Sequence, residues 1–148
     1  MLLERKKATE FKRQGGLLVD ISPYTASDYR TLQALLMSQD YKGFDDITAE
    51  SLPKIGFMAS IDGTPVAVGF LRRLEGGYAQ LDTLVSNGNL SSELRHEGVS
   101  ALVDSLIQAA KDLKLKGIVA HTQDQGVLKR ALSLGFRVVQ QAIIALPL

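Results

Sequence analysis

The chain has 148 residues, of which 45% are hydrophobic and 22% charged, and its formal net charge is +1. This length and composition predict one globular domain with its own hydrophobic core. Because the chain has no cysteine, disulfides, thiolate catalysis and cysteine-ligated zinc are excluded. No apolar run is long enough to span a membrane and no signal peptide is recognisable, so we expect a cytoplasmic protein.

Residues 1–16 are predicted to form a basic N-terminal arm, and residues 17–148 a single domain. The arm ends at Gly15 and Gly16 and has more basic than acidic residues. A solvated tail and a docking arm for a protein or a polyanion both agree with this composition. Nucleic-acid binding is the weakest interpretation, because the basic residues are confined to sixteen positions with one aromatic residue, Phe11.

The first elements of the domain are a strand and two helices. A strand over 16–22 is followed by a helix over 25–39, for which Thr25 or Ser27 is the N-cap. A short second helix over 46–55 is ended by its proline.

Three consecutive strands are predicted over 56–86. Two turn signals separate them, Asp62-Gly63 and Gly76-Gly77, and the first of these is typical of a tight hairpin.

A long amphipathic helix is predicted over 89–113, and Ser91 or Ser92 would cap it. Gly98 falls on its apolar face. One interpretation is that this glycine brings backbone N–H groups close to a phosphate. The other is that it only relieves close packing inside a helix that has already begun, and both interpretations stay open.

The chain ends with a strand over 117–122, a helix over 124–135 closed by Gly135, and a strand over 136–148. The full order is β-α-α-β-β-β-α-β-α-β. This order predicts an α/β fold, in which a mixed sheet carries helices on its faces.

Four segments in this order resemble the GNAT superfamily of acyl-CoA-dependent N-acyltransferases. They are "ISPYTASDYRTLQALL", "FMASIDGTPVAVGFLRRLE", "AQLDTLVSN" and "SLGFRVV". The resemblance covers nearly the whole chain after residue 17. It implies the GNAT fold, in which two strands splay apart to admit the cofactor.

The resemblance also implies where acetyl-CoA would bind. The family motif Gln/Arg-x-x-Gly-x-Gly/Ala is matched by Arg95, Gly98 and Ser100, with serine as the one substitution. The pantetheine arm would run beside Leu84 and Val85. The implied N–H donors to the pyrophosphate are His96, Glu97, Gly98, Val99 and Ser100.

The candidate catalytic residues are Asp82, His121 and Tyr78. The tyrosine that commonly protonates the leaving thiolate in this family is replaced here by Ala131, so Tyr78 is the best-placed phenol to replace it. Asp82 is a candidate base or a residue of a solvated strand face. His121 is a candidate acid or base, or a structural histidine at a strand end.

Two arginines, Arg72 and Arg73, end the third strand. They form either a solvated hairpin tip or a site for a substrate anion. No metal site is predicted, because two histidines without cysteine give no plausible ligand spacing.

Two functions remain open. The first is an N-acyltransferase with a degenerate site, which transfers an acetyl group to an unidentified small-molecule or protein amine. The second is a non-catalytic structural or interaction protein, since "LDTLVSNGNLSSELRHEG" is similar to GNAT-like proteins of tailed-phage genomes. In that case the arm and "AIIALPL" would mediate assembly in a virion. The resemblance also implies a homo-oligomer paired through its last strands.

Overall fold

The computed structural model describes residues 10–14, 16–39, 47–122, 125–139 and 144–148. These residues form a six-stranded sheet in the order β1-β2-β3-β4-β5-β6. Neighbouring strands are antiparallel, except that β5 and β6 are parallel. The strands are β1 (Glu10–Gln14), β2 (Leu17–Pro23), β3 (Ile55–Ile61), β4 (Thr64–Arg73), β5 (Tyr78–Ser86) and β6 (Gly117–Val119).

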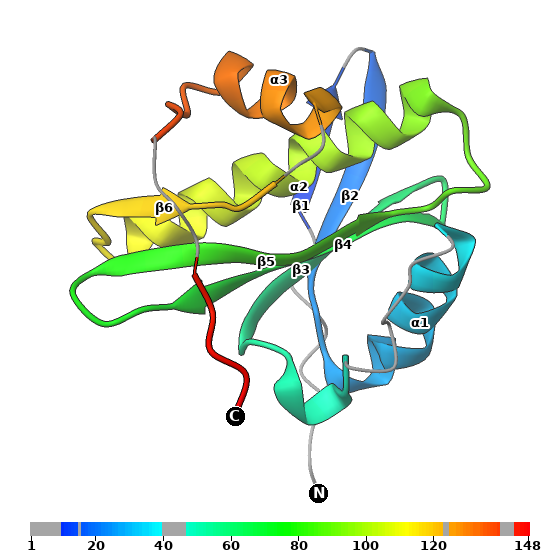
Figure 1. The fold of residues 1–148 in the computed structure, drawn as a ribbon. Helices are drawn as coiled ribbons and strands as arrows, with labels where there is room; N and C mark the ends of the chain where they lie inside the picture. Colours follow the sequence, from blue (N-terminus) through cyan, green and yellow to red (C-terminus); the bar gives the residue numbers. More distant parts are fainter. Residues whose placement is uncertain (1–9, 15, 40–46, 123–124, 140–143) are drawn as a thin grey trace, which may run out of the picture.

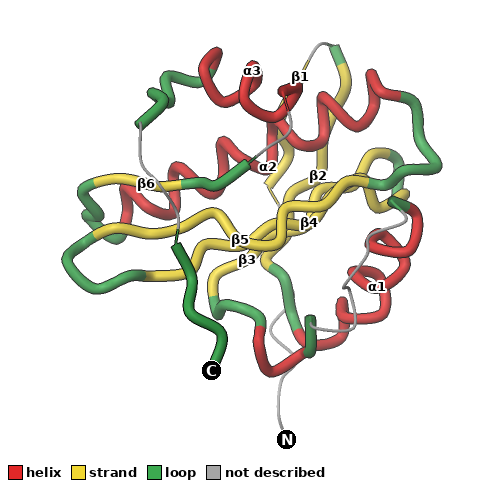
Figure 2. Tube along the Cα trace, in the orientation of Figure 1, coloured by secondary structure: helices red, strands yellow, loops and turns green. Residues whose placement is uncertain are grey.

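Helices cover both faces of the sheet. The helices are α1 (Tyr29–Ser38), α2 (Ser92–Asp112) and α3 (Gln125–Ser133), with 3₁₀ turns η1 (Ala26–Asp28) and η3 (Ala49–Ser51). Figure 1 shows α2 and α3 on one side of the sheet and α1 on the other, and Figure 2 shows the same arrangement by element type. In the described part of the chain, no helix has the length and apolarity needed to cross a membrane.

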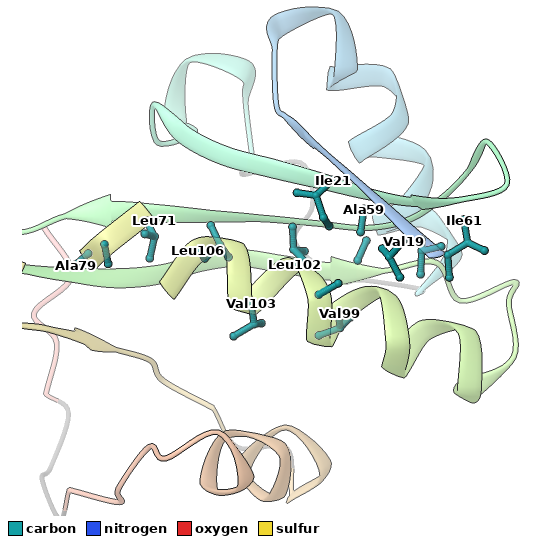
Figure 3. Close-up of a cluster of buried hydrophobic side chains, with 14 residues drawn as sticks. Val19, Ile21, Ala59, Ile61, Leu71, Ala79, Val99, Leu102, Val103 and Leu106 are labelled. Atoms are coloured by element: carbon teal, nitrogen blue, oxygen red, sulfur yellow. The ribbon is translucent and has the colours of Figure 1, made fainter. Parts of the chain in front are cut away.

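The larger core lies between α2 and the sheet (Figure 3). Leu102 and Leu106 of α2 are fully buried against the strands. Gly98 allows the closest approach, because a Cβ atom there would overlap the side chain of Val66 and lie 2.9 Å from its Cβ. The helix therefore packs directly on β4 at this point.

A smaller core lies on the opposite face, under α1. Leu32, Leu35 and Leu36 of α1 pack against strand residues that include Phe70 and Val85. These leucines recur at helical spacing, so the predicted amphipathic helix is confirmed. The predicted N-cap Thr25 lies before η1 and makes a capping box with Asp28, and α1 continues from there.

The predicted three-strand unit is also confirmed. Asp62 and Gly63 both have positive φ, at 50° and 78°, as a two-residue hairpin turn requires. Gly76 and Gly77 likewise have positive φ, at 85° and 89°, and connect β4 to β5.

Three expectations differ from the structure. Residues 10–14, expected in the arm, form β1 and pair with β2 from Glu10↔Ile21 to Gln14↔Leu17. The helix expected over 46–55 is only the single turn η3, capped by Thr48, because the proline that follows leaves no room for a second turn. Residues 40–46 lie outside the described residues.

The third difference concerns the last strand, expected over 136–148. Residues 136–139 and 144–148 form no strand, and 140–143 lie outside the described residues. Gly135, with φ 93°, does end α3 as predicted, and the N–H of Phe136 donates to the carbonyl of Ala131 at 3.1 Å.

Candidate functional site

β5 and β6 diverge after a short parallel pairing. The pairing joins Tyr78–Gln80 of β5 to Gly117–Val119 of β6. β5 continues to Ser86, and no described residue pairs with its β6-side edge beyond Gln80. Backbone N–H and C=O groups on such an edge are available to an extended ligand.

A β-bulge lies in β5 beside this divergence. Thr83 and Leu84 together face the single residue Gly69 of β4, because the register shifts between Val68 and Phe70. Thr83 has φ 49°, an uncommon value for a β-branched residue. A Cβ atom on Gly69 would lie 2.8 Å from Leu84, so the glycine makes room for the re-aimed side chain. Bulges of this kind often accompany functional sites.

α2 begins a few residues after β5 ends. The Ser91 Oγ accepts the N–H of Leu94 at 3.2 Å, and the Ser91 carbonyl accepts the N–H of Arg95 at 3.1 Å. The N–H groups of Ser92 and Glu93 have no acceptor within the helix, as in the first turn of any helix. With the positive end of the helix dipole, they favour an anion at this position.

The loop between β5 and α2 uses its own N–H groups. The Asn87 N–H donates to the Val66 carbonyl at 2.7 Å, and the Gly88 N–H donates to Ser38 Oγ at 2.8 Å. The Asn89 N–H donates back to Asn87 Oδ1 at 3.0 Å. The open donors near the end of β5 are therefore in the first turn of α2 rather than in the loop.

Asp82 precedes the bulge and is held on both carboxylate oxygens. Its Oδ2 accepts from Arg72 Nε at 2.7 Å, and its Oδ1 accepts from Thr83 Oγ1 at 2.6 Å. Arg72 also donates to the Ser51 carbonyl at 2.8 Å. Arg72 is thus not a freely solvated hairpin tip, because it connects β4, β5 and η3.

The sequence and the fold of this chain differ in what they match among known proteins. No protein-family model matches the sequence, and no curated protein matches it. Among solved structures, a GNAT-family acetyltransferase from Staphylococcus aureus superposes with a TM-score of 0.69 at 18% identity, over 83% of this chain and 87% of that one. A ribosomal-protein-alanine N-acetyltransferase from Brucella melitensis superposes with a TM-score of 0.65 at 21% identity, over 88% and 99%.

The chain has the fold of the GNAT acetyltransferases. A third match, a Mycobacterium tuberculosis protein solved in complex with CoA, gives a TM-score of 0.63 at 19% identity, over 84% of this chain and 75% of that one. The predicted GNAT fold is therefore confirmed, and the divergence of β5 and β6 corresponds to the splayed strands that the resemblance implied.

The residues matched to the GNAT phosphate motif lie inside α2. Five residues, expected to offer N–H groups, fall within the helix after its first turn, where each N–H bonds to the carbonyl four positions earlier. They are His96, Glu97, Gly98, Val99 and Ser100. Arg95 precedes them, and its buried Nε has no hydrogen-bond partner in the described part of the chain. Of the two interpretations of Gly98, the structure supports close packing, here against Val66.

The three catalytic candidates lie at different positions along the diverging strands β5 and β6. His121 is exposed and lies two residues beyond β6. Asp82 lies two residues beyond Gln80, the last residue of β5 that pairs with β6. Tyr78 lies at the closed end, with its ring 3.0 Å from a Cβ atom placed on Gly117. Asp82 and His121 therefore both follow the paired segment of β5 and β6, whereas Tyr78 lies at the start of that segment.

The sequence did not predict the roles of four site residues, although it named Ser92 as a possible helix cap and Arg72 as part of a possible anion site. Ser92 and Glu93 carry the open N–H groups, Thr83 makes the bulge, and Arg72 holds Asp82. The serine N-cap signal could have located the first two, because it fixes where the helix starts.

Within the described residues, no group of three or more His, Asp or Glu side chains could hold a metal ion.

Proposed function

We propose that this protein is an acyl-CoA-dependent N-acyltransferase that uses acetyl-CoA as donor and an amine as acceptor. The observation that carries the proposal is the continuity of two open sets of backbone groups. The unpaired edge of β5 leads within a few residues to the free N–H groups at the start of α2. One extended ligand with an anionic end can use both sets.

The β5 edge suits the pantetheine arm. Its amide groups can pair with the backbone at Leu84 and Val85 as an added strand would. The bulge at Thr83 changes the direction of the backbone at this point. A backbone N–H of Leu84 or Val85 would also stabilise the oxyanion that forms when an amine attacks the thioester carbonyl.

The start of α2 suits the pyrophosphate. Ser92 and Glu93 would donate their N–H groups to it, and the guanidinium of Arg95 would supply positive charge from the same turn. The Glu93 side chain is exposed, so its carboxylate can remain in solvent, away from the phosphates. This assignment places the phosphate site at Ser92 and Glu93, which precede the motif-implied donors that begin at His96.

His121 is the proposed acid–base residue. Its neutral imidazole would accept the proton from the acceptor amine, and its protonated form would deliver a proton to the leaving thiolate. Asp82 would not act as the base, because both of its carboxylate oxygens already accept hydrogen bonds, from Arg72 and Thr83. Its negative charge would instead attract and orient the acceptor amine.

Amine acceptors are supported by the neighbours in the same fold. One is an aminoglycoside acetyltransferase from an uncultured soil metagenomic sample, solved with sisomicin, with a TM-score of 0.64 at 14% identity. Another, AAC(6')-Iy, was solved with a bisubstrate analogue that joins CoA to acetylneamine, with a TM-score of 0.64 at 15% identity.

Release of free CoA thiol in the presence of an amine panel tests the proposal. The chain has no cysteine, so a thiol reagent gives no protein background. We expect acetyl-CoA-dependent thiol release, and a fall in kcat of about 100-fold or more in His121→Gln. Tyr78→Phe is the control and should retain activity. Full activity in His121→Gln would contradict the assigned acid–base role.

A non-catalytic GNAT-like protein is the second candidate. The replacement of the usual tyrosine by Ala131 favours it, as does the engagement of both Asp82 oxygens by neighbours. The similarity of residues 81–98 to GNAT-like proteins of tailed phages would place it in a virion or its assembly. Acetyl-CoA binding without thiol release from any amine would support this candidate.

A further inference from the structure

A small cavity lies between the C-terminal half of α2 and the sheet, and no step of the proposed reaction uses it. Its volume is about 160 Å³, and its walls come from the end of β2, the start of β3 and one face of α2. Ile21 and Phe57 supply apolar walls. A cavity of about 150 Å³ can hold a molecule the size of benzene, so this one is large enough for a small organic ligand.

The cavity contains a buried hydroxyl group. Ser105 lines the cavity and is only 5% exposed, and its Oγ has no hydrogen-bond partner among the described residues. A serine inside a helix often bonds back to the carbonyl four residues earlier, but the Ser105 Oγ makes no such bond. Because a buried hydroxyl without a hydrogen bond is unfavourable, the cavity favours a ligand that brings a hydrogen-bonding group to Ser105.

The mouth of the cavity offers hydrogen-bond acceptors and a negative charge. Gln108 and Asp112 both line it and are exposed. The Gln108 Nε2 donates to Asp112 Oδ1 at 2.9 Å, which leaves the second carboxylate oxygen of Asp112 for a ligand. Asp112 makes no ion pair with any described residue. Since Asp112 is also the last residue of α2, the negative end of the helix dipole adds to its charge and favours a cation there.

The separation of the two polar groups sets the shape of the ligand. Ser105 and Asp112 are seven positions apart in α2, which corresponds to about 10 Å along the helix axis. A ligand that reaches both must therefore be elongated. Its middle must be apolar, because it would lie against Ile21 and Phe57.

We infer that this cavity binds a small aliphatic amino alcohol. The ammonium group would donate to the Asp112 carboxylate and to the Gln108 amide oxygen at the mouth, and the hydroxyl group would bond to Ser105 Oγ at the buried end. The site is separate from the proposed acyl-CoA site, because Ser105 lies about 20 Å along the helix from Ser92. The inference does not depend on acyl transfer.

A nuclear magnetic resonance titration of the isotope-labelled protein, without acetyl-CoA, tests the site. The probes are 6-aminohexanol and hexylamine, which lacks the hydroxyl group. We expect 6-aminohexanol to bind with a Kd of about 1 mM and to shift the amide signals of residues 105–112. Hexylamine should bind about fivefold more weakly, because it offers Ser105 no partner. The absence of saturable shifts, or shifts confined to β5 and the start of α2, would overturn the inference.

Two variants test the polar contacts one at a time. In Ser105→Ala, 6-aminohexanol and hexylamine should bind equally, because the ligand hydroxyl has lost its partner. In Asp112→Asn, 6-aminohexanol should bind at least about threefold more weakly than in the wild type. Glu50→Gln is the control, since it makes the same kind of change at an exposed carboxylate in η3 and should leave both affinities unchanged. A preference for 6-aminohexanol that persists in Ser105→Ala, or an unchanged affinity in Asp112→Asn, would overturn the inference.

Discussion

Two parts of the chain have similar apolar patterning but different packing. The first runs from β2 to the end of α2, and the second follows α2. In the first part, the apolar faces of α1 and α2 meet opposite faces of one sheet, and leucines such as Leu102 are fully buried. In the second part, α3 has an apolar face and no buried residue. An amphipathic pattern therefore specifies a helix, whereas burial requires a complementary surface.

Truncation of a leucine in each part should show the largest contrast. Leu102→Ala removes a fully buried side chain and should lower the free energy of unfolding by about 3 kcal/mol. Leu132→Ala, at a site 48% exposed, should lower it by less than about 0.5 kcal/mol in the monomer. Urea denaturation of both variants at low protein concentration measures the difference. Equal losses would mean that α3 is packed as tightly as α2.

A smaller effect is expected at the closest helix–sheet contact. Gly98→Ala places a Cβ atom against Val66, and this overpacking should outweigh the gain in helix propensity, for a net loss of about 2 kcal/mol. Val66→Ala in the same chain should restore part of the stability. A purely additive double mutant would show that the two residues do not limit the approach of α2.

The smallest effect concerns a polar atom inside the well-packed part. The buried Tyr24 hydroxyl has no hydrogen-bond partner among the described residues, so Tyr24→Phe should raise the free energy of unfolding by about 1 kcal/mol at neutral pH. The Tyr24 ring, in edge contact with Phe70 at 4.8 Å, is retained.

The same variant has a pH signature. Burial raises the pKa of Tyr24 above its usual value of 10.0, and the nearby charges of Asp28 and Tyr29 add to the shift. A raised folded-state pKa contributes stability below pH 10 that is lost as the pH rises through the folded pKa. Relative to Tyr24→Phe, the wild type should therefore lose stability above about pH 10. Parallel stability curves through this range would contradict the burial of the phenol.

Local signals predicted most of the fold. The Asp62-Gly63 turn, the serine cap of α2 and Gly135 after α3 each fix one backbone geometry by short-range chemistry. β1 was not predicted, because its charged residues such as Lys12 look like a solvated arm. That segment is a strand because its backbone pairs with the edge of β2.

The candidate site was predicted less well, because it depends on register. The Arg72–Asp82 pair spans ten residues across a hairpin, and the bulge at Thr83 carries no glycine or asparagine signal. The motif around Gly98 pointed to a phosphate loop, but the helix had already begun at Ser92. The last strand, expected over 136–148, has a strand-like sequence, but residues 136–139 and 144–148 join no strand of the described sheet.

Titration calorimetry of acetyl-CoA against a matched pair of variants tests the central claim most directly. Proline is tolerated at the first position of a helix but has no N–H, and Ser91 already has φ −60° and ψ 154°, which suit the residue before a proline. Ser92→Pro therefore removes one proposed phosphate donor, whereas Ser92→Ala keeps it.

We predict micromolar binding of acetyl-CoA by the wild type and by Ser92→Ala. In Ser92→Pro the affinity should fall about tenfold, as expected for one charge-assisted hydrogen bond. Absence of binding heat in the wild type, or equal affinity in all three proteins, would contradict an acyl-CoA site at the start of α2.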